Sequence, residues 1–179
     1  LSTLYLHHNS ITRLEENVFV GAENIIYMHL QHNAISVVTN ESFLALENVR
    51  EFYLHENKLT VVPDDAFKSL TRVLHFYINS NDIQKISAAT LKPLKEVRQL
   101  GLHDNQLSSI PRGAFGDMTM VIQIFLQSNQ LEEVLAGTFS NLPILSKIWL
   151  QGNKIRVVMA GAFTNLPNFR FLSIQDNQI

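Results

Sequence analysis

The chain repeats one pattern every 24 residues, and this period constrains its fold more than any other feature. Asparagine marks the period, at Asn9, Asn33, Asn57, Asn81, Asn105, Asn129, Asn153 and Asn177. Numbered from Leu1, each unit carries apolar residues at positions 1, 4, 6, 11 and 14, and phenylalanine or leucine at position 19. Repetition at about 20 to 50 residues is typical of a solenoid, in which each coil packs against its neighbours. We therefore expect residues 1–179 to form a single repeat domain of seven complete units and a partial eighth, without terminal caps.

The strand pattern within a unit predicts how the coils stack. In VRQLGLHDN, residues 97–105, apolar side chains alternate at Leu100 and Leu102, which indicates a strand of about three to five residues with one buried face. Equivalent strands follow one coil apart in the same direction, so they form a parallel sheet. The predicted fold is an α/β-type solenoid, a right-handed horseshoe with a parallel concave sheet and a mostly irregular convex side.

Asparagine at position 9 falls in the turn after each strand, where a buried amide needs partners for both its oxygen and its nitrogen. Stacked identical turns supply such partners from the same coil and from the neighbouring one. We interpret the eight asparagines as a structural ladder that takes no direct part in function.

The pattern LxxLxLxxNxL followed by xxFxxLxx resembles that of leucine-rich-repeat proteins over all 179 residues. The 24-residue length and the phenylalanine at position 19 are similar to the typical subclass, which includes Toll-type receptors, Slit, the Nogo receptor and variable lymphocyte receptors. This resemblance implies an extracellular location, in a secreted protein or a cell-surface ectodomain. The chain departs from that subclass by having no cysteine-bearing caps, since it contains no cysteine. We expect that the chain is a segment of a longer protein or that a partner covers its ends. The isolated segment is expected to associate through its uncapped ends.

Function in such a fold depends on side chains that point outward from the strands. Positions 3 and 5 carry an excess of aromatic and histidine side chains, which supply large contact areas and are enriched in binding hot spots. We predict a concave ligand-binding face made of Tyr5, Tyr27, His29, Tyr53, His75, Tyr77, Phe125, Trp149 and Phe171. Gly101 interrupts the aromatic row at position 5, either as a dip that admits a ligand side chain or as ordinary sequence drift. Trp149 is expected to be solvent-exposed.

The seven histidines fall at outward strand positions or at strand ends. His8, His32 and Glu56 occupy position 8 of consecutive units, as a two-histidine, one-carboxylate metal site would require. The alternatives are a partner contact that responds to pH and a plain polar contact surface. Apart from this candidate set, the sequence predicts no metal and no other cofactor.

Charge and chemistry exclude several classes of function. A net charge of −2 and a pI near 6.4 give no overall attraction to nucleic acid, and no apolar run is long enough for a membrane segment. No nucleophile, base and orienting group are grouped as in a hydrolytic enzyme, so we expect no enzyme and no catalytic residue. The triplet Asn40-Glu41-Ser42 is a glycosylation candidate.

Together these features predict a protein-recognition module that binds a protein ligand on its concave face, in an immune or developmental receptor or a secreted binder. The alternative is a cell-adhesion or matrix protein whose main act is to associate with itself as a homo-oligomer. The two hypotheses differ in whether a partner other than the chain itself is required.

Overall fold

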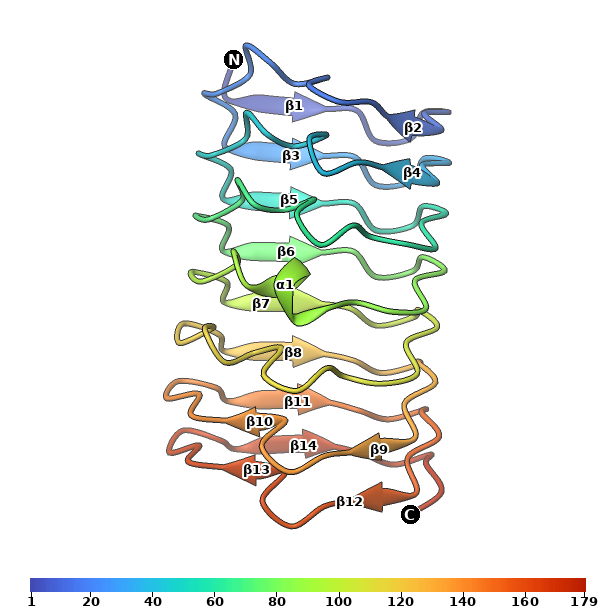
Figure 1. The fold of residues 1–179 in the computed structure, drawn as a ribbon, viewed down its shortest axis with the longest axis vertical. Helices are drawn as coiled ribbons and strands as arrows, with labels where there is room; N and C mark the ends of the chain where they lie inside the picture. Colours follow the sequence, from blue (N-terminus) through green and yellow to red (C-terminus); the bar gives the residue numbers. More distant parts are fainter.

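The computed structural model describes all of residues 1–179, and it is a stack of eight coils with the two termini at opposite ends (Figure 1). One strand from each coil joins an eight-stranded parallel sheet, in the order β1-β3-β5-β6-β7-β8-β11-β14. These strands are all three residues long: β1 Thr3–Tyr5, β3 Tyr27–His29, β5 Glu51–Tyr53, β6 His75–Tyr77, β7 Gln99–Gly101, β8 Gln123–Phe125, β11 Lys147–Trp149 and β14 Phe171–Ser173. The register follows the repeat, so that Leu4 pairs with Met28 and Met28 pairs with Phe52. The predicted parallel sheet and solenoid are confirmed.

The side opposite this sheet contains little regular structure, as the sequence predicts. Three pairs of two-residue parallel strands lie there: β2 Arg13–Leu14 with β4 Val37–Val38, β9 Glu133–Val134 with β12 Val157–Val158, and β10 Phe139–Ser140 with β13 Phe163–Thr164. The one helix, α1 Ala88–Leu91, begins after Ser87, whose hydroxyl accepts a hydrogen bond from the Thr90 amide at 3.1 Å. No helix of the chain has the length and apolar character that a membrane crossing requires.

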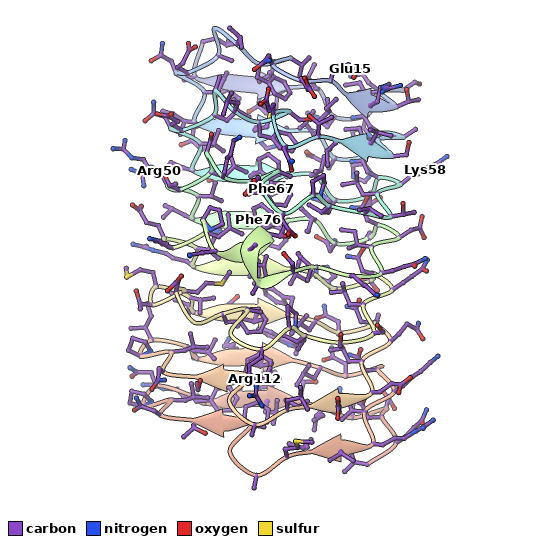
Figure 2. The ribbon with its side chains drawn as sticks, in the orientation of Figure 1. Glu15, Arg50, Lys58, Phe67, Phe76 and Arg112 are labelled. Atoms are coloured by element: carbon purple, nitrogen blue, oxygen red, sulfur yellow. The ribbon has the colours of Figure 1, made fainter.

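The core fills the space between the sheet and the irregular side. Its apolar side chains form one continuous cluster along the stack. Phenylalanines from both sides interlock there: Phe43 of the irregular side meets Phe52 of β5 edge to face, with ring centroids 5.0 Å apart. Figure 2 shows Phe67 and Phe76 inside the coils, whereas Arg50 and Lys58 point out from opposite edges. Because a fully buried phenylalanine contributes about 1.5 to 3 kcal/mol, this interlocking holds the two sides together.

The position-9 asparagines bond both within and between coils. Asn105 is 5% exposed, and its side-chain oxygen accepts a hydrogen bond from the amide of Ile83 at 3.1 Å. Its nitrogen donates to the carbonyls of Ile78 and Leu102, each at 3.2 Å. The same pattern, with partners in the preceding coil, is found from Asn33 to Asn177. Asn9, in the first coil, bonds only to its own turn.

Position 8, just before each asparagine, has left-handed backbone in every coil. The φ angles there run from 51° to 69°, at His8, His32, Glu56, Ser80, Asp104, Ser128, Gly152 and Asp176. A residue with a Cβ pays about 1 to 2 kcal/mol for this conformation. The turn therefore favours Gly and, among residues with a Cβ, Asn, Asp or His, so that Glu56 is the clearest departure from that preference.

Candidate functional site: the sheet face

The outward side of the eight-stranded sheet, which we call the sheet face, carries every residue predicted for ligand binding. Side chains alternate along a strand, so positions 3 and 5 point outward while position 4 enters the core. Position 3 supplies Tyr27, His75 and Phe171, and position 5 supplies Tyr5, His29, Tyr53, Tyr77, Phe125 and Trp149. Exposure varies along the face: Tyr5 is 65% exposed, whereas Tyr77 and Trp149 are half-buried.

The position-5 rings form a ladder in which each ring rests against the next. Centroid separations are 4.8 Å from Tyr5 to His29, 5.0 Å from His29 to Tyr53, and 5.7 Å from Tyr53 to Tyr77. Rings at these separations attract one another beyond the area they bury, by about 0.5 to 1.5 kcal/mol per pair. The ladder is therefore a continuous platform of rings that pack against one another.

Gly101 does not interrupt this platform. A Cβ placed on Gly101 would lie 2.8 Å from Tyr77 Cε1, because the ring of Tyr77 lies across the glycine. From there Tyr77 reaches Phe125, two coils away, at a centroid distance of 6.4 Å. The dip considered for Gly101 is thus already filled by Tyr77, and the glycine is what allows the ladder to continue.

Trp149 is less exposed than the sequence suggests. Its indole stacks on Phe125 at 4.3 Å with an interplanar angle of 15°, and Phe171 tilts against it at 5.3 Å. The indole points outward as predicted, but it is only partly exposed to solvent. The reason is that the position-5 side chain of the preceding coil covers one face of its ring. Tyr27 and His75 make no ring contact with the ladder.

Two tyrosine hydroxyls are held by neighbours on the face. Tyr53 donates a hydrogen bond to Glu51 Oε2 at 2.9 Å, and Tyr77 donates to Gln99 Oε1 at 2.6 Å. Burial and the bond to Glu51 raise the pKa of Tyr53, and burial raises the pKa of Tyr77. Both phenols therefore remain neutral, with their rings fixed in orientation.

Position 7 is a row of polar side chains on the sheet face that the sequence interpretation missed. It is occupied in every coil by an imidazole or an amide: His7, Gln31, His55, Asn79, His103, Gln127, Gln151 and Gln175. In the first seven coils one nitrogen or oxygen atom of this side chain is buried without a hydrogen-bond partner, for example Nδ1 of His55 and Oε1 of Gln127. The restriction of this position to His, Gln and Asn in all eight units was the signal available in the sequence.

Rows 5, 7 and 8 surround a shallow hollow of about 320 Å³ near the middle of the face. Its lining consists of Tyr53, His55, Glu56, Tyr77, Asn79 and His103. Burial lowers the pKa of His103 below its usual value, and the neighbouring Asp104 opposes that effect. The hollow therefore presents neutral rings and one carboxylate.

The histidines predicted to share a site gather at the upstream end of this hollow. His8 and His32 are stacked, with centroids 4.2 Å apart and planes at 9°. His32 Nδ1 lies 2.7 Å from Glu56 Oε2. The group whose ligand atoms all lie within 4.8 Å of one another is His32, His55 and Glu56, with His55 where the sequence placed His8.

The glycosylation candidate lies on the irregular side, where Asn40 is exposed. Ser42, the third residue of the triplet, is fully buried; its hydroxyl donates to the Leu14 carbonyl at 2.7 Å and accepts from the Thr39 amide at 2.8 Å. Ser42 therefore has a structural role that does not depend on a glycan at Asn40.

Comparison with known families identifies the repeat. The family model described as Leucine rich repeat matches residues 1–59, 47–107, 96–155 and 123–179. The chain belongs to the leucine-rich-repeat family. A comparison with curated protein sequences found no match.

Several solved leucine-rich-repeat structures superpose on the chain. The TLR13–ssRNA13 complex is similar over 98% of this chain and 25% of its own, with a TM-score of 0.91 and 24% identity. The APL1 leucine-rich repeat domain is similar over 99% of this chain and 44% of its own, with a TM-score of 0.84 and 18% identity. An internalin, inlF, from Listeria monocytogenes is similar over 100% of this chain and 49% of its own, with a TM-score of 0.79 and 19% identity. The chain thus spans half or less of these proteins, and the likeness establishes the leucine-rich-repeat fold.

Proposed function

We propose that this leucine-rich-repeat chain is a recognition module that binds a protein ligand on its sheet face, the side predicted to be concave. The continuous aromatic ladder from Tyr5 to Trp149, bridged over Gly101 by Tyr77, is the observation that supports this most. Repeat proteins use such extended surfaces for binding, and a contiguous apolar patch on a folded surface is typical of an interaction site.

The ladder suits a protein ligand because its rings are already ordered. Association costs about 0.5 to 1.5 kcal/mol for each rotamer-rich side chain that becomes immobilised. Tyr53 and Tyr77 are held by hydrogen bonds, and Trp149 is held by its stack on Phe125. These side chains therefore have little conformational freedom left to lose.

The charge of the sheet face favours a protein with basic groups over a nucleic acid. Positions 3, 5, 7 and 8 carry one lysine, Lys147, and four carboxylates, at Glu51, Glu56, Asp104 and Asp176. One similar structure is a complex with ssRNA13, but phosphate binding depends on an excess of Lys and Arg. The acidic excess here would repel a phosphate backbone and attract lysine and arginine side chains.

The setting we propose is extracellular, in a secreted binder or a cell-surface ectodomain. The match of all 179 residues to the repeat family and the 24-residue unit with phenylalanine at position 19 support it. In this setting Asn40 is an accessible glycan acceptor. Self-association, as in an adhesion protein, is the competing function.

The experiment is an interaction screen in which the chain is displayed against an array of secreted and cell-surface ectodomains. Any partner found is titrated against the wild type, Trp149→Ala and Val61→Ala. Val61 is 68% exposed and lies off the sheet face, which makes it the matched control. Trp149→Ala should weaken binding by about 30-fold, as expected for a hot spot worth about 2 kcal/mol.

Two results would contradict the proposal. One is a partner whose affinity is the same for Trp149→Ala and the wild type but lower for Val61→Ala, which would place the interface elsewhere. The other is a dimer that grows with concentration in light scattering and competes with every partner, which would favour self-association.

A further inference from the structure

We propose that His32, His55 and Glu56 form a binding site for one divalent transition-metal ion of the zinc class at the upstream end of the sheet-face hollow. His55 packs edge to face against Tyr53 and Tyr77 of the aromatic ladder, but the three proposed ligands are not ladder residues, and the proposal does not depend on the protein-binding function. It combines side chains from two consecutive coils: His32 follows β3, and the adjacent residues His55 and Glu56 follow β5.

The geometry is close to that of a three-ligand site. The candidate ligand atoms all lie within 4.8 Å of one another, and His32 Nδ1 and Glu56 Oε2 are 2.7 Å apart. With bond lengths of about 2.0 to 2.2 Å, the ligands of a tetrahedral zinc ion lie about 3.3 Å apart. To hold zinc, His32 Nδ1 and Glu56 Oε2 must move slightly apart, and the ring of His55 must move closer to them. Partly exposed side chains at a surface can make such small movements.

The ligand types select the class of metal. Two imidazoles and one carboxylate suit Zn²⁺, Co²⁺, Ni²⁺ or Cu²⁺, whereas Mg²⁺ and Ca²⁺ prefer an all-oxygen shell. Neither ring nitrogen of His55 is engaged in a hydrogen bond or ion pair, so no competing contact has to be broken there. Burial lowers the pKa of His55, which keeps the ring in the neutral form that binds metal.

Neighbouring residues orient the site. His8 lies parallel to His32 at 4.2 Å, and His32 meets His55 edge to face at 5.8 Å. His8 is therefore a positioning residue that fixes the plane of His32. Three protein ligands leave a coordination position open to water or to a donor group from a molecule on the sheet face.

The next comparable place in the repeat lacks one ligand and serves as a control. His103 and Asp104 occupy positions 7 and 8 as His55 and Glu56 do, with His103 Nε2 3.9 Å from Asp104 Oδ2. The preceding coil carries Ser80 where His32 would be required. Two ligands on one coil do not make a three-ligand site, so His103 should contribute nothing to metal affinity.

The test is titration of the tag-free, chelator-treated protein with Zn²⁺ by calorimetry and with Co²⁺ by visible absorption. We expect one Zn²⁺ or Co²⁺ ion per chain and the visible absorption of Co²⁺ in a low-symmetry site. Both should be lost at acidic pH, because a protonated imidazole cannot bind the metal. His32→Gln, His55→Gln and Glu56→Gln should each lower the affinity at least about tenfold, the effect of removing about 1.4 kcal/mol. His103→Gln should bind as tightly as the wild type.

Circular dichroism of each variant checks that the coils remain folded, so that a lost ion is not mistaken for a lost fold. Absence of saturable binding of Zn²⁺ and Co²⁺ to the folded wild type would overturn the site. Equal affinity of the wild type, His32→Gln and His55→Gln would also overturn it, because the ion would then be bound elsewhere. Neither result would bear on the screen for protein ligands.

Discussion

The ring of Tyr77 lies across the backbone of Gly101, so that a Cβ at residue 101 would come within 2.8 Å of Tyr77 Cε1. This contact joins the two halves of the aromatic ladder, because Tyr77 then reaches Phe125 at 6.4 Å. The absence of a side chain at one position thus decides the continuity of a surface seven coils long.

Gly101→Ala should force the Tyr77 ring away and lower the free energy of unfolding by about 1 kcal/mol, at the low end for overpacking, since the ring is half-buried. Urea denaturation measures the change. In the background of Tyr77→Ala the same substitution should cost much less, because nothing then occupies the space. Equal costs in the two backgrounds would show that the contact does not constrain residue 101.

Asn105→Ala should lower the free energy of unfolding by about 1 to 3 kcal/mol, because it leaves the buried Ile83 amide unpaired and removes one of the two side-chain hydrogen bonds that the carbonyls of Ile78 and Leu102 each accept. Thermal or urea unfolding provides the measurement. Asn24→Ala is the control, since Asn24 is exposed, and it should change stability by less than about 0.5 kcal/mol. Asn141 is also exposed, but it is not a suitable control, because its left-handed backbone, with a φ of 57°, would by itself make alanine unfavourable.

Phe125→Ala should shift the fluorescence of Trp149, the single tryptophan, to longer wavelength. The phenyl ring covers one face of the indole at 4.3 Å, and its removal lets water reach that face. Emission of the wild type should accordingly lie between that of a buried and that of a solvated indole. Tyr27→Ala, on the same face but outside the stack, should leave the spectrum unchanged.

Ser42→Ala should lower the free energy of unfolding by about 1 to 3 kcal/mol, since the fully buried hydroxyl satisfies the Leu14 carbonyl and the Thr39 amide. Asn40→Gln also destroys the glycosylation triplet but leaves both bonds in place. It should be neutral in unglycosylated protein. If the two variants melted at the same temperature, Ser42 would have no structural role beyond the triplet.

Stability should fall as the pH is lowered below 6.5, in part because of His103. Burial lowers the pKa of His103 in the folded protein relative to 6.5, so the unfolded chain binds more protons in that window. The contribution is fully present above pH 6.5 and is lost as the pH falls through the folded pKa. His103→Gln should flatten the dependence of the unfolding free energy on pH in metal-free protein, and NMR should show the ring titrating below 6.5.

The sequence alone determined the fold, because a buried position in a stacked coil must recur in every unit. The 24-residue period set the register of the sheet, in which Leu4 faces Met28 and Met28 faces Phe52. The period also determined which side chains point outward, since alternation along a strand leaves no choice once position 4 is buried. Two of the three proposed metal ligands could be identified from the sequence in the same way, because His32 and Glu56 both occupy position 8 of their units.

Only the tertiary structure decided how neighbouring outward side chains meet. Whether Tyr77 lies over Gly101 and how far Phe125 covers Trp149 depend on side-chain torsions, which the repeat does not dictate. The same holds for His55, which joins His32 and Glu56 although it occupies a different row, because it directly precedes Glu56 in the turn after β5. Spacing along the chain specifies the row a residue occupies, whereas contacts between rows depend on the path of the backbone and the rotamers it allows.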